Sequence, residues 1–503
     1  MNDMKSTISI AGKSILIFGN ESSEECVYQD LVDQLRRYNI FESLNWIGKK
    51  SYHLSNYDNV NSILAYVSMV LIKHCNDHRT KSIDDNGLLK VVESYVCLKD
   101  PLSEDGDGVA YLLRYGAVCW DYARPIMYTI PRTYLLFSKL WGECSKVTID
   151  LKNDIEEITG LKLEDLLYMA LLFHSRSKNG HVLKYKDSNV SLLNDENQNL
   201  FFKFVSCEYE TFRNECKEIR TGYEKYSFNP LLKFPLIRSQ KRPYELDVKP
   251  YLVPVPDLLL YRVTNGLFFD LAERYRGRKK DNPFRTSFGY VFQDYVGELL
   301  KRTVPEHQVL PEFKYDKTND SPDWLLLDGD KLVVLEVKHP ILYLNAKQFG
   351  ESATVKKDLK QTIGKAVIQL YKFEEAIKSS NDIKLSRFKQ CKIQRLIVTY
   401  DSGYFLNSFI KDCSEEILKD SIGVVPDNFD FQAISIDDFE YLIGGYGKYL
   451  FSFLKNKVCS KEHREMDFRE YIYAQNNSDQ CKNEFLESVF DDFLSRQCRR
   501  TSE

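Results

Sequence analysis

Two carboxylates and an ammonium group stand at a fixed spacing within residues 321–338, which read SPDWLLLDGDKLVVLEVK. The two apolar runs of this segment are joined by Asp328-Gly329, and Asp-Gly is a strong signal for a tight turn, so the segment predicts a β-hairpin. Side chains alternate between the faces of a strand. Glu336 and Lys338 therefore lie on the same face of the second strand.

The hairpin also brings Asp323 to that face. If the loop that begins at Asp328 has two residues, Asp323 falls opposite Val334; if the loop has four residues, Asp323 falls opposite Glu336. A shift of two residues keeps every side chain on its own face, so both registers place Asp323 beside Glu336 and Lys338. The sequence thus predicts two carboxylates and one ammonium group at the end of an otherwise apolar hairpin.

A divalent cation would stabilise such a group. Adjacent carboxylates repel each other, and charged side chains in a partly buried strand need partners. Asp and Glu oxygens suit Mg²⁺, which keeps several waters and often bridges to a phosphate. A bound metal can activate one of those waters, and Lys338 would orient the water or neutralise the attacked phosphate. The alternative is an edge hairpin whose Asp, Glu and Lys are simply solvated.

Pro322-Asp323 followed by Glu336-Val337-Lys338 resembles the signature of the PD-(D/E)xK nuclease superfamily, which has the restriction-endonuclease-like fold. The resemblance implies that Asp323 and Glu336 bind Mg²⁺, for which Mn²⁺ can substitute, and that the backbone carbonyl of Val337 adds a ligand. It implies that Lys338 assists the attacking water. The implied activity is endonucleolytic hydrolysis of nucleic acid, with DNA favoured over RNA. By fold-level analogy alone, such architectures occur in bacterial restriction and anti-phage defence.

The segment 286–300 has apolar residues at helical spacing and predicts an amphipathic helix capped by Thr286 or Ser287. The family places such a helix before its first strand, often with an acidic residue directed at the metal. The position that aligns most naturally holds Gln293, so this contribution stays unassigned. Two acids lie nearby, Asp294 and Glu298, and Glu298 is the candidate for an additional metal ligand; a solvated helix face is the alternative.

After the hairpin, the sequence predicts a helix over 356–378 and a strand over 395–400. The family often carries a catalytic Gln on this helix, a role that Gln369, or Gln361 two turns earlier, would fill; a polar residue at the edge of the core is the alternative. The predicted fold is α+β or α/β, with an α-rich N-terminal region followed by a restriction-endonuclease-like αβββαβ core and C-terminal helical additions. The predicted domains are 1–270, 271–410 and 411–503.

Two basic segments flank the predicted site and would hold a phosphate backbone against it. Either segment could instead be a solvated linker or helix face. The first contains Arg274, Arg276, Arg278, Lys279, Lys280 and Arg285, and the second contains Lys347, Lys356, Lys357, Lys360 and Lys365.

The composition of the chain argues against several classes of protein. A chain of 503 residues that is 43% hydrophobic can bury a large core, and its net charge of −4 argues against nucleic-acid binding by the whole surface. No segment approaches the roughly 20 apolar residues of a membrane span. The start of the chain lacks the layout of a signal peptide. Twelve single cysteines without a Cys-x-x-Cys pair indicate reduced thiols, so we expect a cytoplasmic protein with no membrane partner.

Residues 1–270 carry no motif with recognisable chemistry, and regulation, target recognition or assembly are the roles that remain for them. The resemblance is compatible with a homo-oligomer, because many such nucleases dimerise to cut both strands. Two alternatives to an active nuclease stay open: an inactive nuclease-like scaffold that binds nucleic acid or a partner protein, and a chance motif in a non-enzymatic interaction protein.

Overall fold

The chain is a mixed α/β protein in which helices predominate and the strands form small sheets. No helix in the part described is long and apolar enough to cross a membrane. Every structural statement below concerns the residues that the computed structural model describes: 7–10, 13–16, 26–54, 60–98, 114, 126–186, 191–240, 248–277, 282–339, 349, 357, 359–360, 362–380, 382–400, 407–423, 429–466, 468–475 and 482–500.

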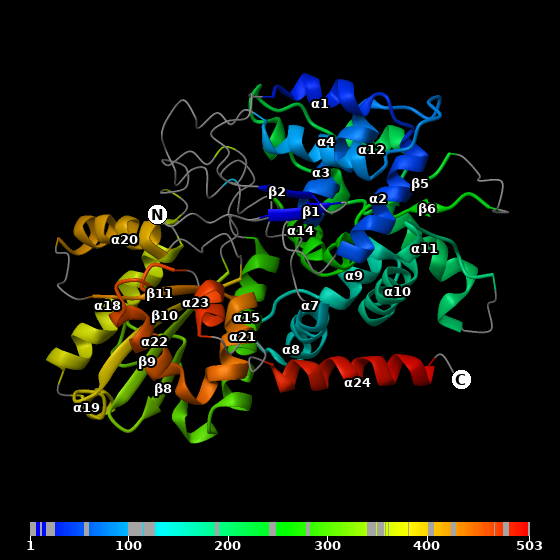
Figure 1. The fold of residues 1–503 in the computed structure, drawn as a ribbon. Coiled ribbons are helices and arrows are strands. Elements are labelled where there is room, and N and C mark those ends of the chain that lie inside the picture. The colour runs from blue at the N-terminus through cyan, green and yellow to red at the C-terminus, as the bar shows by residue number, and fades with distance from the viewer. Residues whose placement is uncertain are drawn as a thin grey trace.

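The chain begins with a short hairpin and a helical bundle that has its own apolar core (Figure 1). α3 (Val60–His74) lies in the middle of this core: all its residues as far as Ile72 are buried, as expected for a helix that is apolar on every side. Asp84 caps the next helix by accepting a hydrogen bond from the Gly87 amide at 2.7 Å. The other elements here are β1 (Thr7–Ile10), β2 (Lys13–Leu16), α1 (Tyr28–Leu35), α2 (Ile40–Leu54), α4 (Asp85–Val96) and α12 (Tyr209–Glu215).

A second group of helices follows, together with a small four-stranded sheet in the order β3-β6-β5-β4. The first helix contains Pro131 and continues through a π-helical segment, Leu135–Lys139, into a short α8. The elements of this group are α7 (Ile126–Tyr134), α8 (Leu140–Glu143), α9 (Leu151–Thr159), α10 (Leu163–Arg176), β3 (His181–Val182), α11 (Asp195–Val205), β4 (Ser206–Cys207), β5 (Leu236–Arg238), β6 (Tyr251–Leu252), α13 (Asp257–Val263) and α14 (Asn265–Arg274).

The remaining elements surround a five-stranded sheet in the order β11-β10-β9-β8-β7. β9, β10 and β11 are parallel to one another, whereas β7, β8 and β9 form antiparallel pairs. The elements are α15 (Pro283–Thr303), β7 (Val309–Pro311), β8 (Trp324–Asp328), β9 (Lys331–Lys338), α18 (Ile363–Ser379), α19 (Ile383–Ser386), β10 (Lys392–Thr399), α20 (Asn407–Ile422), β11 (Gln432–Ser435), α21 (Ile436–Tyr446), α22 (Leu450–Cys459), α23 (Phe468–Ala474) and α24 (Glu484–Arg500).

Helices cover both faces of this sheet (Figure 1). Leu332 and Val334 of β9 belong to an apolar cluster with residues of α18 and α20. Val333 and Leu335, which alternate with them, belong to the main core with residues of α15 and α21. Because both faces are buried, β9 is apolar along most of its length, and the few charged side chains on it stand out.

α15 begins one turn earlier than the sequence predicted. Its N-cap is Asn282, whose side chain accepts from the Arg285 amide at 3.2 Å, and Pro283 occupies the first turn. The expected caps lie inside the helix: the Thr286 hydroxyl donates to the Asn282 carbonyl at 3.2 Å, and Ser287 is buried. The prediction of Thr286 or Ser287 as the cap was therefore wrong, because Asn-Pro supplies a stronger start signal upstream.

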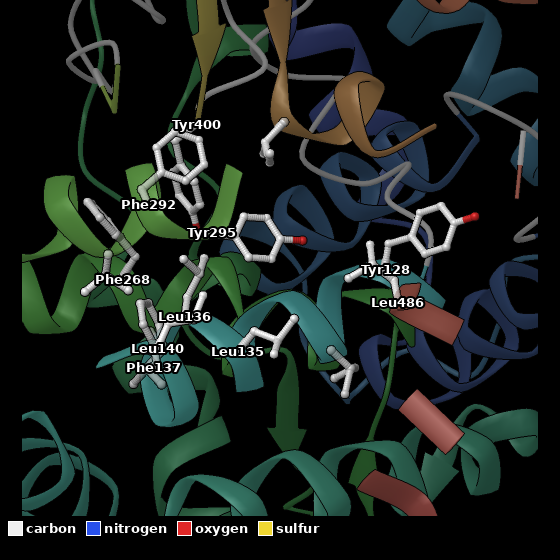
Figure 2. Close-up of a cluster of buried hydrophobic side chains, with 14 of the residues drawn as sticks. Tyr128, Leu135, Leu136, Phe137, Leu140, Phe268, Phe292, Tyr295, Tyr400 and Leu486 are labelled. Atoms are coloured by element: carbon white, nitrogen blue, oxygen red, sulfur yellow. The ribbon is translucent and has the colours of Figure 1, made fainter. Parts of the chain in front are cut away.

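The main core joins both halves of the chain. Figure 2 shows side chains of α7 and the π-helical segment packed with α15 residues such as Phe292 and Tyr295, together with Tyr400. A buried charge network crosses the same boundary: Arg132 of α7 donates to Glu440 of α21 at 2.5–2.6 Å, and the Tyr295 hydroxyl donates to the same carboxylate at 2.5 Å. The sheet is therefore anchored to the N-terminal half by apolar packing and by charge.

Candidate active site

The β8–β9 hairpin sets the geometry of the predicted site. Asp328 pairs with Lys331, so the turn consists of Gly329 and Asp330, and the pairing ends at Trp324 and Leu335. Gly329 has φ +59°, a conformation that glycine adopts without strain. Continued by one residue, this register places Asp323 opposite Glu336, which is the second of the two pairings that the sequence allowed. The loop predicted with that pairing was wrong: it has two residues, not four, because Asp328 and Lys331 are themselves paired.

Three of the predicted residues are brought together at the end of the hairpin. The Asp323 carboxylate accepts a hydrogen bond from the Val337 amide at 2.6 Å. Glu336, only 1% exposed, forms an ion pair with Lys338 through one carboxylate oxygen. Its other oxygen, Oε2, is buried and has no hydrogen-bond partner within the described residues. Lys338 is 27% exposed, so the group reaches the surface on the side of its ammonium.

Burial raises the pKa of both carboxylates. Burial is the main cause for Asp323, whose pKa rises to about 6 although Lys338 lowers it. Burial and then the Asp323 charge raise the pKa of Glu336 to about 8. Burial opposes the charged form of Lys338, yet the charges of Glu336 and Asp323 outweigh burial and raise its pKa. With both carboxylates ionised, the site would therefore hold more negative charge than its protein partners stabilise.

This excess fits a divalent cation. Asp323 and Glu336 supply hard oxygen ligands. The Oε2 atom of Glu336 accepts no hydrogen bond from the described residues, and a cation bound to this oxygen would supply the missing positive partner. The Val337 carbonyl fits as well: the register places Pro322 opposite Val337, and proline has no N–H to donate to it. No group of three His, Cys, Asp or Glu side chains in the described part of the chain is arranged to hold a metal. The residues thus suit an ion that keeps several waters, such as Mg²⁺.

The acidic candidates of α15 make their contacts with groups other than this pair. Glu298 lies 3.8 Å from Lys301 and 3.7 Å from Arg302, both on its own helix, as expected of a helix surface. Desolvation raises the pKa of Asp294, although a hydrogen bond with the Cys144 side chain and the charge of Lys146 lower it. Gln293 contributes its backbone carbonyl, which accepts from the Trp324 indole at 2.9 Å. None of these contacts joins α15 side chains to Asp323 or Glu336.

Gln369 lies near the hairpin. Its side-chain amide donates to the Ser321 carbonyl at 3.4 Å, two residues before Asp323. α18, which carries Gln369, packs on the face of the sheet that bears Glu336, so Gln369 is placed beside the segment that leads into the site. Gln361, the other candidate for this role, lies outside the described residues.

The lysines and arginines predicted to bind nucleic acid differ in exposure and in their partners. Arg276 is largely exposed and lies 3.3 Å from Glu273, and Arg285 lies over the Phe268 ring. Lys360 is paired with Asp420 at 2.6 Å, whereas Lys357 and Lys365 are exposed. Arg274 bonds to two acids of α9, Asp154 and Glu157. The rest lie outside the described residues: Arg278, Lys279, Lys280, Lys347 and Lys356.

The structure adds two residues that sequence reasoning missed. Glu312 follows β7, and its amide donates to the Asp323 carbonyl at 3.0 Å, so the register places Glu312 opposite Asp323; its charge helps to raise the pKa of Asp323. His339 follows Lys338 directly, and burial lowers its pKa to about 4. Its Nδ1 atom is buried without a partner among the described residues. Glu312 was missed because its place opposite Asp323 depends on the pairing of β7 with β8, which the sequence analysis did not predict.

Comparison with protein-family models, with curated proteins and with solved structures finds no match to this chain. The function is therefore inferred from the residues of the site and from their geometry.

Proposed function

We propose that this protein is a metal-dependent nuclease that hydrolyses phosphodiester bonds, with DNA as the favoured substrate and Mg²⁺ as the ion. The observation that carries the proposal is the pair of buried carboxylates, Asp323 and Glu336, with one oxygen lacking a partner and Lys338 beside it. A buried pair of this kind is costly for a chain that does not use it, because like charges destabilise each other and desolvation penalises both.

The order of elements around the pair supports the proposal. Within the described residues the order is α15, β7, β8, β9, α18 and β10, with the four-residue helix α19 between the last two. This agrees with the αβββαβ order implied by the resemblance to PD-(D/E)xK nucleases, and Asp323 and Glu336 lie at adjacent strand ends of the sheet. We therefore propose a restriction-endonuclease-like core around these strands.

Each residue has a defined task in this proposal. Asp323, Glu336 and the Val337 carbonyl would hold the ion, which when bound supplies a Lewis acid that activates water and stabilises charge on phosphate oxygens. Lys338 would donate hydrogen bonds to the attacking water or to a phosphate oxygen, since an ammonium group has three donors and no acceptor. Burial of the apolar hairpin keeps these groups in position before the substrate arrives.

The test is incubation of the purified protein with supercoiled plasmid DNA in Mg²⁺, in Mn²⁺ and in EDTA. We expect metal-dependent nicking that falls by at least about 100-fold in Asp323→Ala and Lys338→Ala. Lys331→Ala is the matched control, because Lys331 stands at the other end of the same strand. Binding of DNA without cleavage in any metal would contradict the nuclease and select an inactive scaffold instead.

A further inference from the structure

A turn from the N-terminal half lies against the start of α15. The Thr148 amide donates to the Ser287 hydroxyl at 3.3 Å. In the same turn, the Lys146 ammonium lies 4.9 Å from the centre of the Tyr290 ring, which is 37% exposed. Two contacts one turn apart on α15 thus fix the path of this turn along the helix.

The same stretch of α15 contacts both strands that carry the carboxylates. The Gln293 carbonyl accepts from Trp324, the residue after Asp323. Gly289 packs so closely on His339, the residue after Lys338, that an added Cβ would lie 2.9 Å from the imidazole ring. Tyr290 lies between these two contact points in the sequence of the helix. Lys146 therefore lies over the stretch of α15 that packs on the residues directly after Asp323 and Lys338.

The charge of Lys146 acts on Asp323 of the site and also on Asp294 of α15, and its ammonium lies over the Tyr290 ring. Its ammonium lowers the pKa of Asp323 and of Asp294. It is exposed, and no ion pair engages it in the part of the chain that the structure describes. A phosphate that approaches Asp323 and Glu336 meets negative charge, so a free cation at the rim would favour its binding.

We propose that Lys146, held over Tyr290, binds a phosphate of the nucleic-acid backbone next to the carboxylate site. This inference rests on the proposed nuclease function and deepens it, because it assigns part of the substrate site to the N-terminal half. Lys146 is a binding residue in this proposal and takes no part in proton transfer. The 144–148 turn joins the nucleic-acid surface, although the sequence places it more than 170 residues before Asp323.

The test compares wild type, Lys146→Ala, Lys146→Arg and Lys203→Ala in the full chain. Lys203 is the matched control: it is an exposed lysine of the same half, on α11, which Figure 1 places far from the five-stranded sheet. Binding of a fluorescein-labelled 30-base-pair DNA duplex is measured in Ca²⁺ between 50 and 200 mM NaCl, and steady-state cleavage of the same duplex is measured in Mg²⁺.

We expect Lys146→Ala to weaken binding about 3- to 10-fold at 50 mM NaCl and to reduce the slope of log affinity against log salt by about 1, the value for one lost phosphate contact. KM should rise while kcat stays within about 2-fold, because the contact is equal in ground and transition states. Lys146→Arg should restore most of the affinity, and Lys203→Ala should behave as wild type.

Two results would overturn the inference, and they are distinguishable. If wild type cleaves DNA and Lys146→Ala keeps the salt slope and KM of Lys203→Ala, Lys146 binds no phosphate and the nuclease proposal stands. If wild type neither binds nor cleaves the duplex, both proposals fail together. An unchanged urea midpoint in Lys146→Ala excludes loss of folding as the cause of weaker binding.

Discussion

Replacement of Glu336 by Gln tests the claim that the site is destabilised by its own charge. Gln keeps the shape of the side chain, keeps an acceptor for Lys338 and removes the ionisable group. In the absence of a divalent cation, the variant should therefore be more stable than wild type at neutral pH, although a buried polar contact has been altered. The same variant should lose metal-dependent cleavage.

The magnitude follows from the shift of the Glu336 pKa, from 4.5 to about 8 on folding. A raised carboxyl pKa means that the folded state binds the proton more tightly than the unfolded state. This contribution to stability is fully present below pH 4.5 and is lost as the pH rises from 4.5 to 8. At pH 7 the loss is about 3 kcal/mol. Because Gln leaves Lys338 with a weaker partner, we expect a net gain of roughly 1–3 kcal/mol.

Urea unfolding in EDTA, followed by tryptophan fluorescence, measures this gain. Trp324 adjoins Asp323 and reports on the site. The advantage of Glu336→Gln should be largest at pH 8 and should shrink to below about 1 kcal/mol at pH 5. Glu298→Gln is the control, since Glu298 lies on the surface of α15, and such changes stay within about 0.5 kcal/mol. Added Mg²⁺ should stabilise wild type and leave Glu336→Gln unchanged.

A variant that is less stable than wild type at pH 7, or equally pH-dependent, would refute this reasoning. Either result would mean that Lys338 fully compensates the buried carboxylate. The site would then have no uncompensated negative charge to attract a cation.

Three further substitutions test the packing beside the site and the buried ion pair between α7 and α21. Gly297→Ala should destabilise the protein by about 1–3 kcal/mol in urea unfolding despite the higher helix propensity of Ala, because the added Cβ would lie 2.0 Å from the Trp324 ring. A Cβ added at Gly142 would have no atom within 4 Å, so Gly142→Ala should be neutral or stabilising. Equal effects of the two substitutions on stability would contradict the close packing of Gly297 on Trp324. Arg132→Met should cost about 3–5 kcal/mol by leaving Glu440 buried without its cation, and a loss below about 1 kcal/mol would show that the pair is dispensable.

The hairpin and its shared face could be predicted from the sequence because they depend on local rules. A period of two places Glu336 and Lys338 together, and Asp328-Gly329 indicates a turn, which the structure places one residue later at Gly329-Asp330. The start of α15 was missed by one turn, although the sequence holds the signal, Asn282-Pro283. Gly297 looks like a weak point of a helix in the sequence, and only the packed Trp324 ring explains it.

The sequence by itself determined the β8–β9 hairpin, its two carboxylates and their common face, since these follow from residue type and spacing along one short segment. Only the tertiary structure decided which oxygen of Glu336 lacks a partner, that Glu312 stands beside Asp323, and that Lys146 of a distant turn lies over Tyr290 of α15. Such contacts depend on strand order and on how helices pack on a sheet. No local period records them, because the residues that meet are separated by long stretches of chain.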